Sequence, residues 1–317
     1  MLHFIIRRLL LMFVVILGAT MLTFSIMHFA PGDPAEMIAT SRYGVEGLST
    51  ETIARIRVEE GLDAPVYVQY LKWLNHVLHG DLGRSLVTGK SVSSEFLARF
   101  PATLKLALAS MIIALLIAIP VGIISATKQY SVVDNASMVG ALIGVSMPNF
   151  WLGLLLMLLF ALYLGLLPVC GYGDGSIAYL ILPAITLGTG MAALTTRLTR
   201  SSMLEVLKQD YITTARTKGL REKVVIWKHA FRNALIPVVT IVGLQFAGLL
   251  EGVVIVETIF AWPGVGKLLV DSIFERDFAM MQCGILFIAV IFVLVNLTVD
   301  ILYALLDPRI RYEKGGN

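Results

Sequence analysis

The chain has 317 residues, of which 57% are hydrophobic and 15% are charged, and its mean hydropathy is +0.82. Ordinary soluble domains carry about 25% charged residues, so this composition excludes a soluble globular protein and indicates a protein that crosses a membrane several times. The net charge of +3 is small, and the basic residues cluster near predicted membrane ends, which does not indicate nucleic-acid binding. Cys170 and Cys283 belong to no CxxC pair and predict neither a zinc site nor a disulfide framework.

Apolar runs long enough to cross about 30 Å of hydrocarbon predict six transmembrane helices. Pro120, Pro148 and Pro183 fall within or beside these runs, and membrane helices tolerate proline where neighbouring protein satisfies the freed carbonyl groups. We therefore expect an all-α membrane protein with a single transmembrane domain over residues 1–317. The six spans are predicted at residues 9–30, 102–126, 137–167, 179–196, 234–256 and 281–306.

Basic residues near the membrane ends predict the orientation of these spans. Arg7 and Arg8 directly precede the first span, whereas residues 31–100 carry seven Lys/Arg and nine Asp/Glu. The positive-inside rule therefore places the N-terminus in the cytoplasm. Six spans return the C-terminus, with its basic residues at 307–311, to the same side. The segment 197–232 agrees, because it carries nine Lys/Arg against three Asp/Glu.

A cleaved signal peptide is the competing interpretation of the N-terminus. The apolar stretch is about 20 residues long, however, which exceeds the hydrophobic region of a signal peptide. It ends at Phe29 and Ala30, directly before Pro31, without a small-residue cleavage pattern. We therefore expect the first helix to be retained.

Two segments, 31–100 and 257–280, are predicted on the outer side. The first begins with a turn at 31–34 and continues with two helices, at 48–62 and 64–79. The second of these helices has apolar residues at helical spacing. We expect the two helices to pack on the membrane face or against other spans, and an entrance for a docked extracytoplasmic protein is the alternative. The apolar, Gly- and Pro-containing loop at 257–280 indicates a re-entrant or interfacial segment.

The sequence contains no motif for nucleotide binding, catalysis or metal binding. Residues 264–267 end like a phosphate-binding loop, but Ala261 stands where the pattern needs Gly, and Leu268 stands where it needs Ser or Thr. HExxH and GxSxG are absent. His76 and His79 lie three residues apart on one predicted helix, and a solvated helix face explains them better than a metal site. We expect this chain to bind no cofactor and to have no catalytic residue.

Ionisable residues inside spans are energetically costly and so indicate function. Glu251 lies in the fifth predicted span, and Gln245 precedes it by about two helical turns. Glu251 is nearer to the outer side, where it faces either a pathway or a hydrogen bond between packed helices. Asp300, in the sixth span, lies near the inner end and is expected to be a structural partner of a cytoplasmic-side Arg.

The polar loop 197–233, between the fourth and fifth spans, is the most informative segment. Residues 210–219 are predicted to form a helix that stops at Gly219, a usual C-terminal signal, and a second short helix is expected at 221–230. Two short helices joined at a glycine form a compact knob that suits a groove on a soluble partner. Anionic lipid headgroups would also attract the cations, but lipid contact would not require this arrangement.

This loop resembles the EAA coupling loop of ABC importer permeases, in the form used by their peptide/nickel branch. Residues 213–215 followed by Gly219 are similar to the core of that motif, and residues 233–237 are similar to its end. Pro237 lies 18 residues after Gly219, later than in the general family pattern, and the longer spacing is like that of this branch. Similar motifs cover nearly the whole chain, at residues 4–9, 31–34, 80–83, 146–151, 257–264 and 307–311.

The resemblance implies a type I ABC importer permease fold with both termini in the cytoplasm, in the inner (plasma) membrane of a bacterial cell. It implies a second homologous permease, two ATP-binding cassette ATPase subunits and an extracytoplasmic binding protein as partners, with lipid contact and no nucleic acid. ATP and Mg²⁺ would be bound by the ATPases, and residues 31–100 fit the first of the two permeases. The expected ATPase-coupling residues are Leu204, Glu205, Asp210, Tyr211, Thr214, Ala215, Arg216 and Gly219. The expected pathway contacts are Asn149, Gln245 and Glu251.

The resemblance leaves the substrate open between two alternatives. Residues 145–151 and 171–173, with the short loop 168–178, look more like nickel permeases, so we expect nickel or a nickel chelate. Residues 199–219 look equally or more like dipeptide and glutathione permeases, so a dipeptide, oligopeptide or glutathione importer is the alternative. An ATP-independent carrier or channel is a third class, but it would leave the coupling loop without a purpose.

Overall fold

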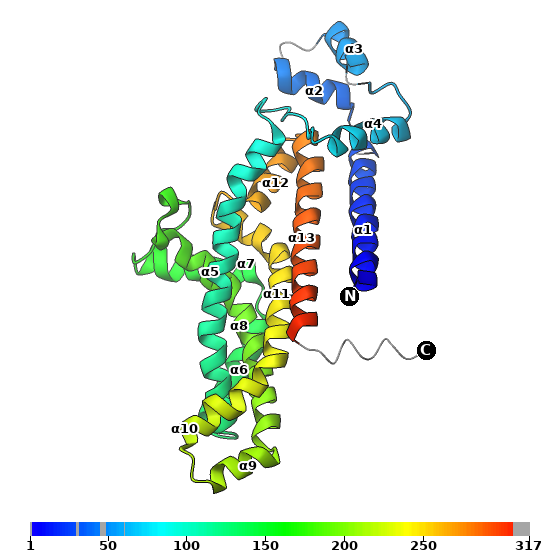
Figure 1. Ribbon diagram of the computed structural model, residues 1–317. Coiled ribbons are helices and arrows are strands. Elements are labelled where there is room, and N and C mark those ends of the chain that lie inside the picture. The colour runs from blue at the N-terminus through cyan, green and yellow to red at the C-terminus, as the bar shows by residue number, and fades with distance from the viewer. Residues whose placement is uncertain (1, 30–31, 45–48, 60, 307–317) are drawn as a thin grey trace. The chain divides into compact units, whose positions relative to one another are not determined.

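The computed structural model describes residues 2–29, 32–44, 49–59 and 61–306, and it is built from helices (Figure 1). Within these ranges, the side chains of residues 2–7, 9, 37, 41, 250, 251 and 300–306 are not described. The helices form two compact units. The first comprises residues 1–101 and 264–294, and the second comprises residues 102–263 and 295–317.

The first unit begins with one long helix and continues with three short ones. Asp33 caps the second helix, because its side chain accepts a hydrogen bond from Ala35 N at 3.0 Å, and Pro34 stands at the first helical position. Arg57 of the next helix donates to the same carboxylate. The elements of this unit are α1 (Leu2–Phe29), α2 (Pro34–Tyr43), α3 (Thr50–Glu59), α4 (Val66–Leu78), the start of α5 (Val92–Thr127), α12 (Val265–Phe274) and most of α13 (Phe278–Leu306).

A buried polar contact fixes the start of α13 within the first unit. Ser85 Oγ donates to Asp277 Oδ2 at 2.5 Å, and Asp277 Oδ1 accepts from Met280 N at 3.1 Å. In the same unit, Phe96 of α5 packs on Phe287 of α13, with ring centroids 5.3 Å apart. The Ser85–Asp277 hydrogen bond therefore attaches the loop between α4 and α5 to the start of α13.

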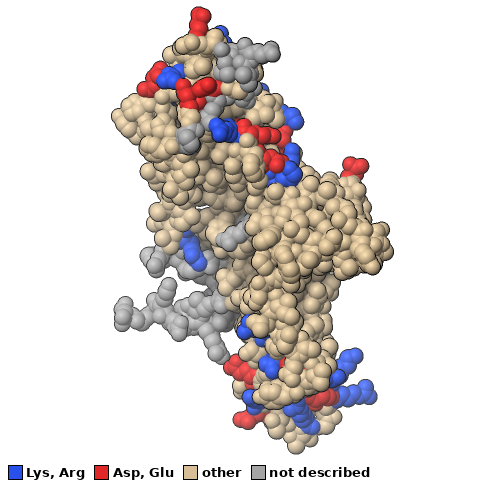
Figure 2. Space-filling model, turned by 180° about the vertical axis from the view of Figure 1, so that it is seen from behind, with Lys and Arg blue, Asp and Glu red and all other residues tan. Residues whose placement is uncertain are grey.

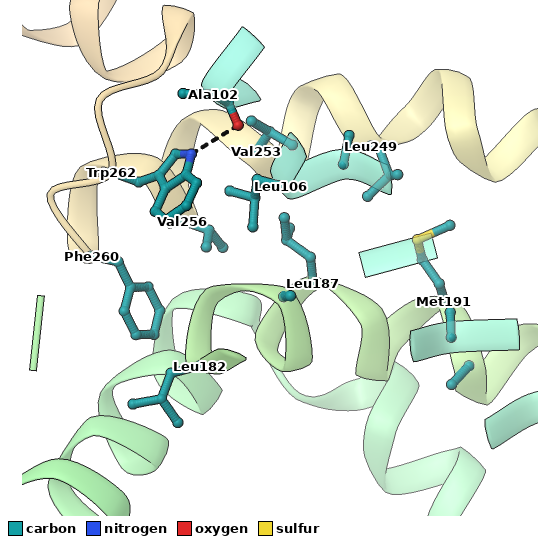
Figure 3. Close-up of a cluster of buried hydrophobic side chains, with 14 of the residues drawn as sticks. Ala102, Leu106, Leu182, Leu187, Met191, Leu249, Val253, Val256, Phe260 and Trp262 are labelled. Carbon is teal, nitrogen blue, oxygen red and sulfur yellow. Dashed lines mark hydrogen bonds between the residues drawn. The ribbon is translucent and has the colours of Figure 1, made fainter. Parts of the chain in front are cut away.

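The second unit holds the larger apolar core, which α5, α8 and α11 share. Leu106, Leu187 and Val253 are almost fully buried there and lie close together in Figure 3. Trp262 closes one end of this core, and its Nε1 donates to Ala102 O at 2.9 Å. The remaining elements are α6 (Val132–Ser146), α7 (Asn149–Leu156), η2 (Met157–Tyr163), η3 (Gly173–Gly175), α8 (Ile177–Leu207), α9 (Asp210–Thr217), α10 (Glu222–Val224), η4 (Val225–Phe231) and α11 (Arg232–Ile259).

Among the described residues, five helices are long and apolar enough to cross a membrane, and one bent pair makes a sixth if it is counted as a single span. The bent pair is the run predicted at 137–167 as one span, which consists of α6 followed by α7 and η2 with a 107° bend between them. Pro148 explains the bend, because proline disfavours helical backbone at the preceding residue, and Met147 is extended at φ −86° and ψ 122°. The fourth helix differs too, since α8 continues to Leu207, well beyond residue 196.

Close contact between α8 and α5 depends on Gly188. A Cβ atom at Gly188 would lie 2.9 Å from the backbone oxygen of Ser110. Gly188→Ala should therefore lower the free energy of unfolding by about 1–3 kcal/mol, since neither backbone can move away without disturbing the core. The measurement is the thermal unfolding of the purified protein in detergent.

Gly140→Ala is the matched control, because Gly140 also lies within a helix but has nothing within 4 Å of its Cβ position. That variant should retain the wild-type melting temperature or exceed it, since alanine favours helix by about 1 kcal/mol over glycine. Equal melting temperatures for the two variants would contradict the close contact at Gly188.

Candidate functional site

The segment predicted as a coupling loop at 197–233 is helical over most of its length. α8 continues through its first part, a short turn follows, and α9 runs from Asp210 to Thr217. Gly219 lies beyond its end at φ +76°, a left-handed conformation that glycine adopts without strain. The second short helix expected at 221–230 is present as α10 and η4, but it continues into α11 without a break.

One face of α9 packs against the rest of the second unit. Ile212 and Ala215 are buried there with Ile123 and Ala126 of α5 and Met203 of α8. These five residues are called the α9 cluster below. Because α9 has an apolar face of its own, it is fixed to the ends of two long helices and cannot swing freely on a flexible loop.

Polar side chains beside this buried face of α9 are held by hydrogen bonds to neighbouring elements. Arg216 donates to both carboxylate oxygens of Glu222, at 2.7 and 3.2 Å, which links α9 to α10 across Gly219. This hydrogen bonding raises the pKa of the Arg216 guanidinium above its ordinary value. Asn233 Nδ2 donates to the Tyr211 hydroxyl at 2.9 Å and so joins α9 to the start of α11.

The residues expected to couple to an ATPase therefore divide into two groups. Ala215 is buried in the α9 cluster, and Leu204 packs against that cluster, so both hold α9 in place. The other six are exposed. They are Glu205, Asp210, Tyr211, Thr214, Arg216 and Gly219. Figure 2 shows charged side chains of both signs gathered around this end of the second unit.

Sequence reasoning missed two exposed apolar side chains beside this polar face. Leu220 is 40% exposed and Trp227 is 47% exposed, close in sequence to Lys and Arg residues. Trp227 stacks edge-to-face on Phe231 with ring centroids 5.5 Å apart, so its orientation is fixed. An exposed tryptophan on a charged surface is typical of a protein-binding surface. The signal in the sequence was a tryptophan within a basic segment.

Two of the three expected pathway residues have described side chains. Gln245 of α11 accepts from Thr195 Oγ1 at 2.8 Å and donates to Met191 O at 3.4 Å, so its amide joins α11 to α8. Asn149, the first residue of α7, is half-buried and makes no side-chain hydrogen bond to the described residues. The side chain of Glu251 lies outside the described part of the chain, as does that of Asp300.

The amide of Asn149 lies against two glycines of neighbouring helices. A Cβ atom at Gly252 of α11 would lie 3.3 Å from Asn149 Nδ2, and one at Gly190 of α8 would lie 3.7 Å from Asn149 Oδ1. The amide therefore occupies space that these glycines leave, directly after the bend at Pro148. It is a polar group that makes no side-chain hydrogen bond within the described part of the chain, and it lies at the break between two membrane segments.

Residues 118–312 match the family described as "Binding-protein-dependent transport system inner membrane component", and residues 1–107 match the N-terminal membrane component of such systems. The chain belongs to this family. It is a multi-pass inner-membrane permease subunit of an ABC importer, and the family resemblance seen in its sequence is confirmed.

The chain also matches named permeases over nearly the full length of both proteins. The chain is 44% identical to the dipeptide transport system permease protein DppB of Escherichia coli (strain K12), over 99% of this chain and 100% of the relative. It is 45% identical to the oligopeptide transport system permease protein AppB of Bacillus subtilis (strain 168), over 98% and 99% of the two chains. It is 44% identical to the glutathione transport system permease protein GsiC of Salmonella paratyphi A, over 99% and 100%.

Solved structures share the fold at low sequence identity. A chain of the MetNI methionine ABC transporter in inward-facing conformations has a TM-score of 0.56 at 17% identity, covering 67% of this chain and 96% of that chain. A chain of an amino acid ABC transporter gives a TM-score of 0.52 at 16% identity, covering 68% and 94%. The expected all-helical ABC importer permease fold is thereby confirmed.

Gly219→Val tests the joint between α9 and α10. A β-branched residue in a left-handed conformation costs about 1–3 kcal/mol, and nothing lies within 4 Å of the Cβ position, so the effect would come from the backbone alone. We expect less substrate uptake per ATP hydrolysed by the assembled transporter, with membrane insertion unchanged. Uptake and hydrolysis are measured together in proteoliposomes.

Gly219→Asn is the matched control for that variant, since asparagine tolerates the left-handed conformation. It should couple uptake to hydrolysis nearly as the wild type does. Normal uptake per ATP in the valine variant would rule out a role for this joint in coupling.

Proposed function

We propose that this chain is one of two permeases of a peptide importer, with dipeptides or short oligopeptides as substrates. The observation that carries this proposal is the set of full-length relatives at 44–45% identity, whose names specify dipeptides, oligopeptides and glutathione. The preference for nickel that residues 145–151 and 171–173 suggested finds no support among these relatives. The peptide alternative is therefore the better hypothesis.

The proposed assembly contains this chain, a second homologous permease, two ATPase subunits and an extracytoplasmic binding protein. ATP and Mg²⁺ belong to the ATPase subunits, and both termini of this chain lie in the cytoplasm. Each ATPase offers a groove to a helix such as α9, whose exposed face carries Asp210, Tyr211 and Thr214. Exposed Leu220 and Trp227 supply apolar contact area beside that face, which supports a protein partner over lipid headgroups alone.

In the proposed mechanism, closure of the ATPases moves α9 as a rigid body. The α9 cluster supports this proposal, because it fixes α9 to the ends of α5 and α8 by buried apolar contacts. Displacement of α9 would therefore tilt these helices and switch the pathway between inward- and outward-facing states. The substrate passes through without tight binding, since a deep binding site would slow its release.

Asn149 is proposed as a transient contact for the passing peptide. A primary amide offers two donors and one acceptor group, which is the complement of a peptide bond. The side chain makes no hydrogen bond to the described residues and lies at the break between α6 and α7. Gln245 is a weaker candidate, since its amide already bonds to α8. Glu251 is proposed as a pathway contact from its position in the fifth predicted span alone.

The first test is to purify the tagged chain from membranes in mild detergent and identify what accompanies it. Recovery of a second permease and two ATPases, with ATP hydrolysis stimulated by a peptide-loaded binding protein, is the expected outcome. Stimulation of ATP hydrolysis by a binding protein loaded with a nickel chelate, and not by one loaded with peptide, would make nickel the substrate in place of peptide. Recovery of this chain alone would contradict the assembly and favour an ATP-independent carrier.

Asn149→Leu tests the proposed pathway contact, because leucine branches at Cγ as asparagine does and has no hydrogen-bonding group. Losing a hydrogen bond of about 0.5–1.5 kcal/mol should reduce dipeptide uptake by about twofold to tenfold, with assembly of the complex unchanged. Uptake of labelled dipeptide into proteoliposomes gives the rate. Asn75→Leu, at an exposed asparagine on α4, is the control and should leave uptake unchanged. Equal uptake by the two variants would remove Asn149 from the pathway.

A further inference from the structure

A buried carboxylate lies in the first turn of α6, at the end of the second unit that carries α9. Asp134 is 1% exposed and accepts hydrogen bonds from four donors. Arg200 of α8 donates its Nε to Oδ1 at 2.6 Å and its Nη2 to Oδ2 at 2.8 Å. Tyr130 N donates to Oδ2 at 2.9 Å, and Ser125 Oγ donates to Oδ1. Both carboxylate oxygens are therefore fully used.

This carboxylate connects three separate helices. Ser125 lies near the end of α5 and is fully buried, Asp134 is the third residue of α6, and Arg200 lies in α8 about two turns before its end. The planar guanidinium binds at two points, so it fixes orientation as well as distance. A buried ion pair is costly to break from one side, because the remaining charge stays buried without its partner.

The three helices are joined to α9 in different ways. α5 and α8 contribute apolar side chains to the α9 cluster, whereas no described residue of α6 packs in that cluster. The start of α6 is instead attached to α8 through Asp134 and Arg200. Further along, Gly144 of α6 lies close to Ala193 of α8, since a Cβ atom at Gly144 would lie 3.1 Å from Ala193 Cβ. α6 is thus held on α8 at two levels.

α6 leads directly to the bend at Pro148 and to Asn149. A displacement of α8 that α6 follows at both ends would carry the bend with it. If α6 were released at its start, apolar packing such as that at Gly144 would still connect it to α8 but would fix no orientation, so the bend would follow α8 less completely. The ion pair is therefore placed where it strengthens the transfer of movement from α9 to the break between α6 and α7.

We propose that Asp134 and Arg200 are positioning residues that make α6 move with α8 and α9, so that movement of the coupling helix reaches the bend at Asn149. This inference rests on the proposed function, in which α9 is the helix that the ATPases move. A merely structural role would lower the amount of assembled transporter without changing peptide uptake per ATP hydrolysed. A transmitting role would lower uptake per ATP in transporters that have assembled.

The test uses the whole transporter in proteoliposomes with its peptide-loaded binding protein, and it measures peptide uptake and ATP hydrolysis in the same sample. Arg200→Lys keeps the charge and loses the two-point contact, and Asp134→Asn keeps the shape and loses the charge. Both should assemble and hydrolyse ATP, with uptake per ATP reduced about fivefold or more. Glu59→Gln is the control, because it neutralises the carboxylate of the exposed Arg55–Glu59 pair in α3 and should leave uptake per ATP unchanged.

The outcomes separate the inference from the proposed function. Wild-type uptake per ATP in both assembled variants would overturn the positioning role and leave the proposed function intact. If Asp134→Asn fails to assemble, Arg200→Lys decides, and an unchanged ratio in that variant overturns the inference. Absence of any binding-protein-stimulated hydrolysis in the wild type would overturn the proposed function together with the inference that rests on it.

Discussion

The structure depends on one constraint, which is that hydrocarbon offers no partner to a backbone N–H or C=O group. Long helices satisfy these groups within themselves, so a departure from regular helix needs support from neighbouring protein. The main departure among the described spans is the bend between α6 and α7, at Pro148. Asn149 begins the second half of that broken span, beside Gly190 and Gly252. The irregular backbone and an amide that makes no side-chain hydrogen bond to the described residues thus occur at one place, against glycines of α8 and α11.

Helix association in this bundle relies on small residues and on few, well-placed polar contacts. Inside a membrane, apolar side chains gain little by leaving lipid, so close packing and hydrogen bonds supply the stability. Gly122 of α5 and Thr199 of α8 approach so closely that a Cβ atom at Gly122 would lie 2.6 Å from Thr199 Cβ. Thr195 and Gln245 join α8 to α11. α8 is therefore the helix on which α5, α6 and α11 all pack, and it is also the one that leads to α9.

Much of this arrangement could be predicted from the sequence, because the apolar runs and the helix–glycine–helix pattern around Gly219 are local signals. The pairing of Asp134 with Arg200 could not, since these residues are 66 positions apart and no local pattern links them. The third span is predicted to begin at residue 137, so Asp134 falls in the preceding polar loop. A charged residue in such a loop is ordinary and gives no sign of a buried ion pair. The exposure of Trp227 was likewise hidden, because periodicity does not show which face of a short helix meets a partner.

The π-helical turn η4, between α10 and α11, has a consequence for how such subunits diverge. A π-turn holds an extra residue within a continuous helix, and each added residue rotates the following faces by about 100°. η4 can therefore absorb a change of one residue between Gly219 and Pro237 without breaking the rod that joins them. Loop length and the phase of the membrane helix can then vary independently, so the segment after Gly219 can change by one residue while the outward-facing and core-facing sides of α11 keep their assignments.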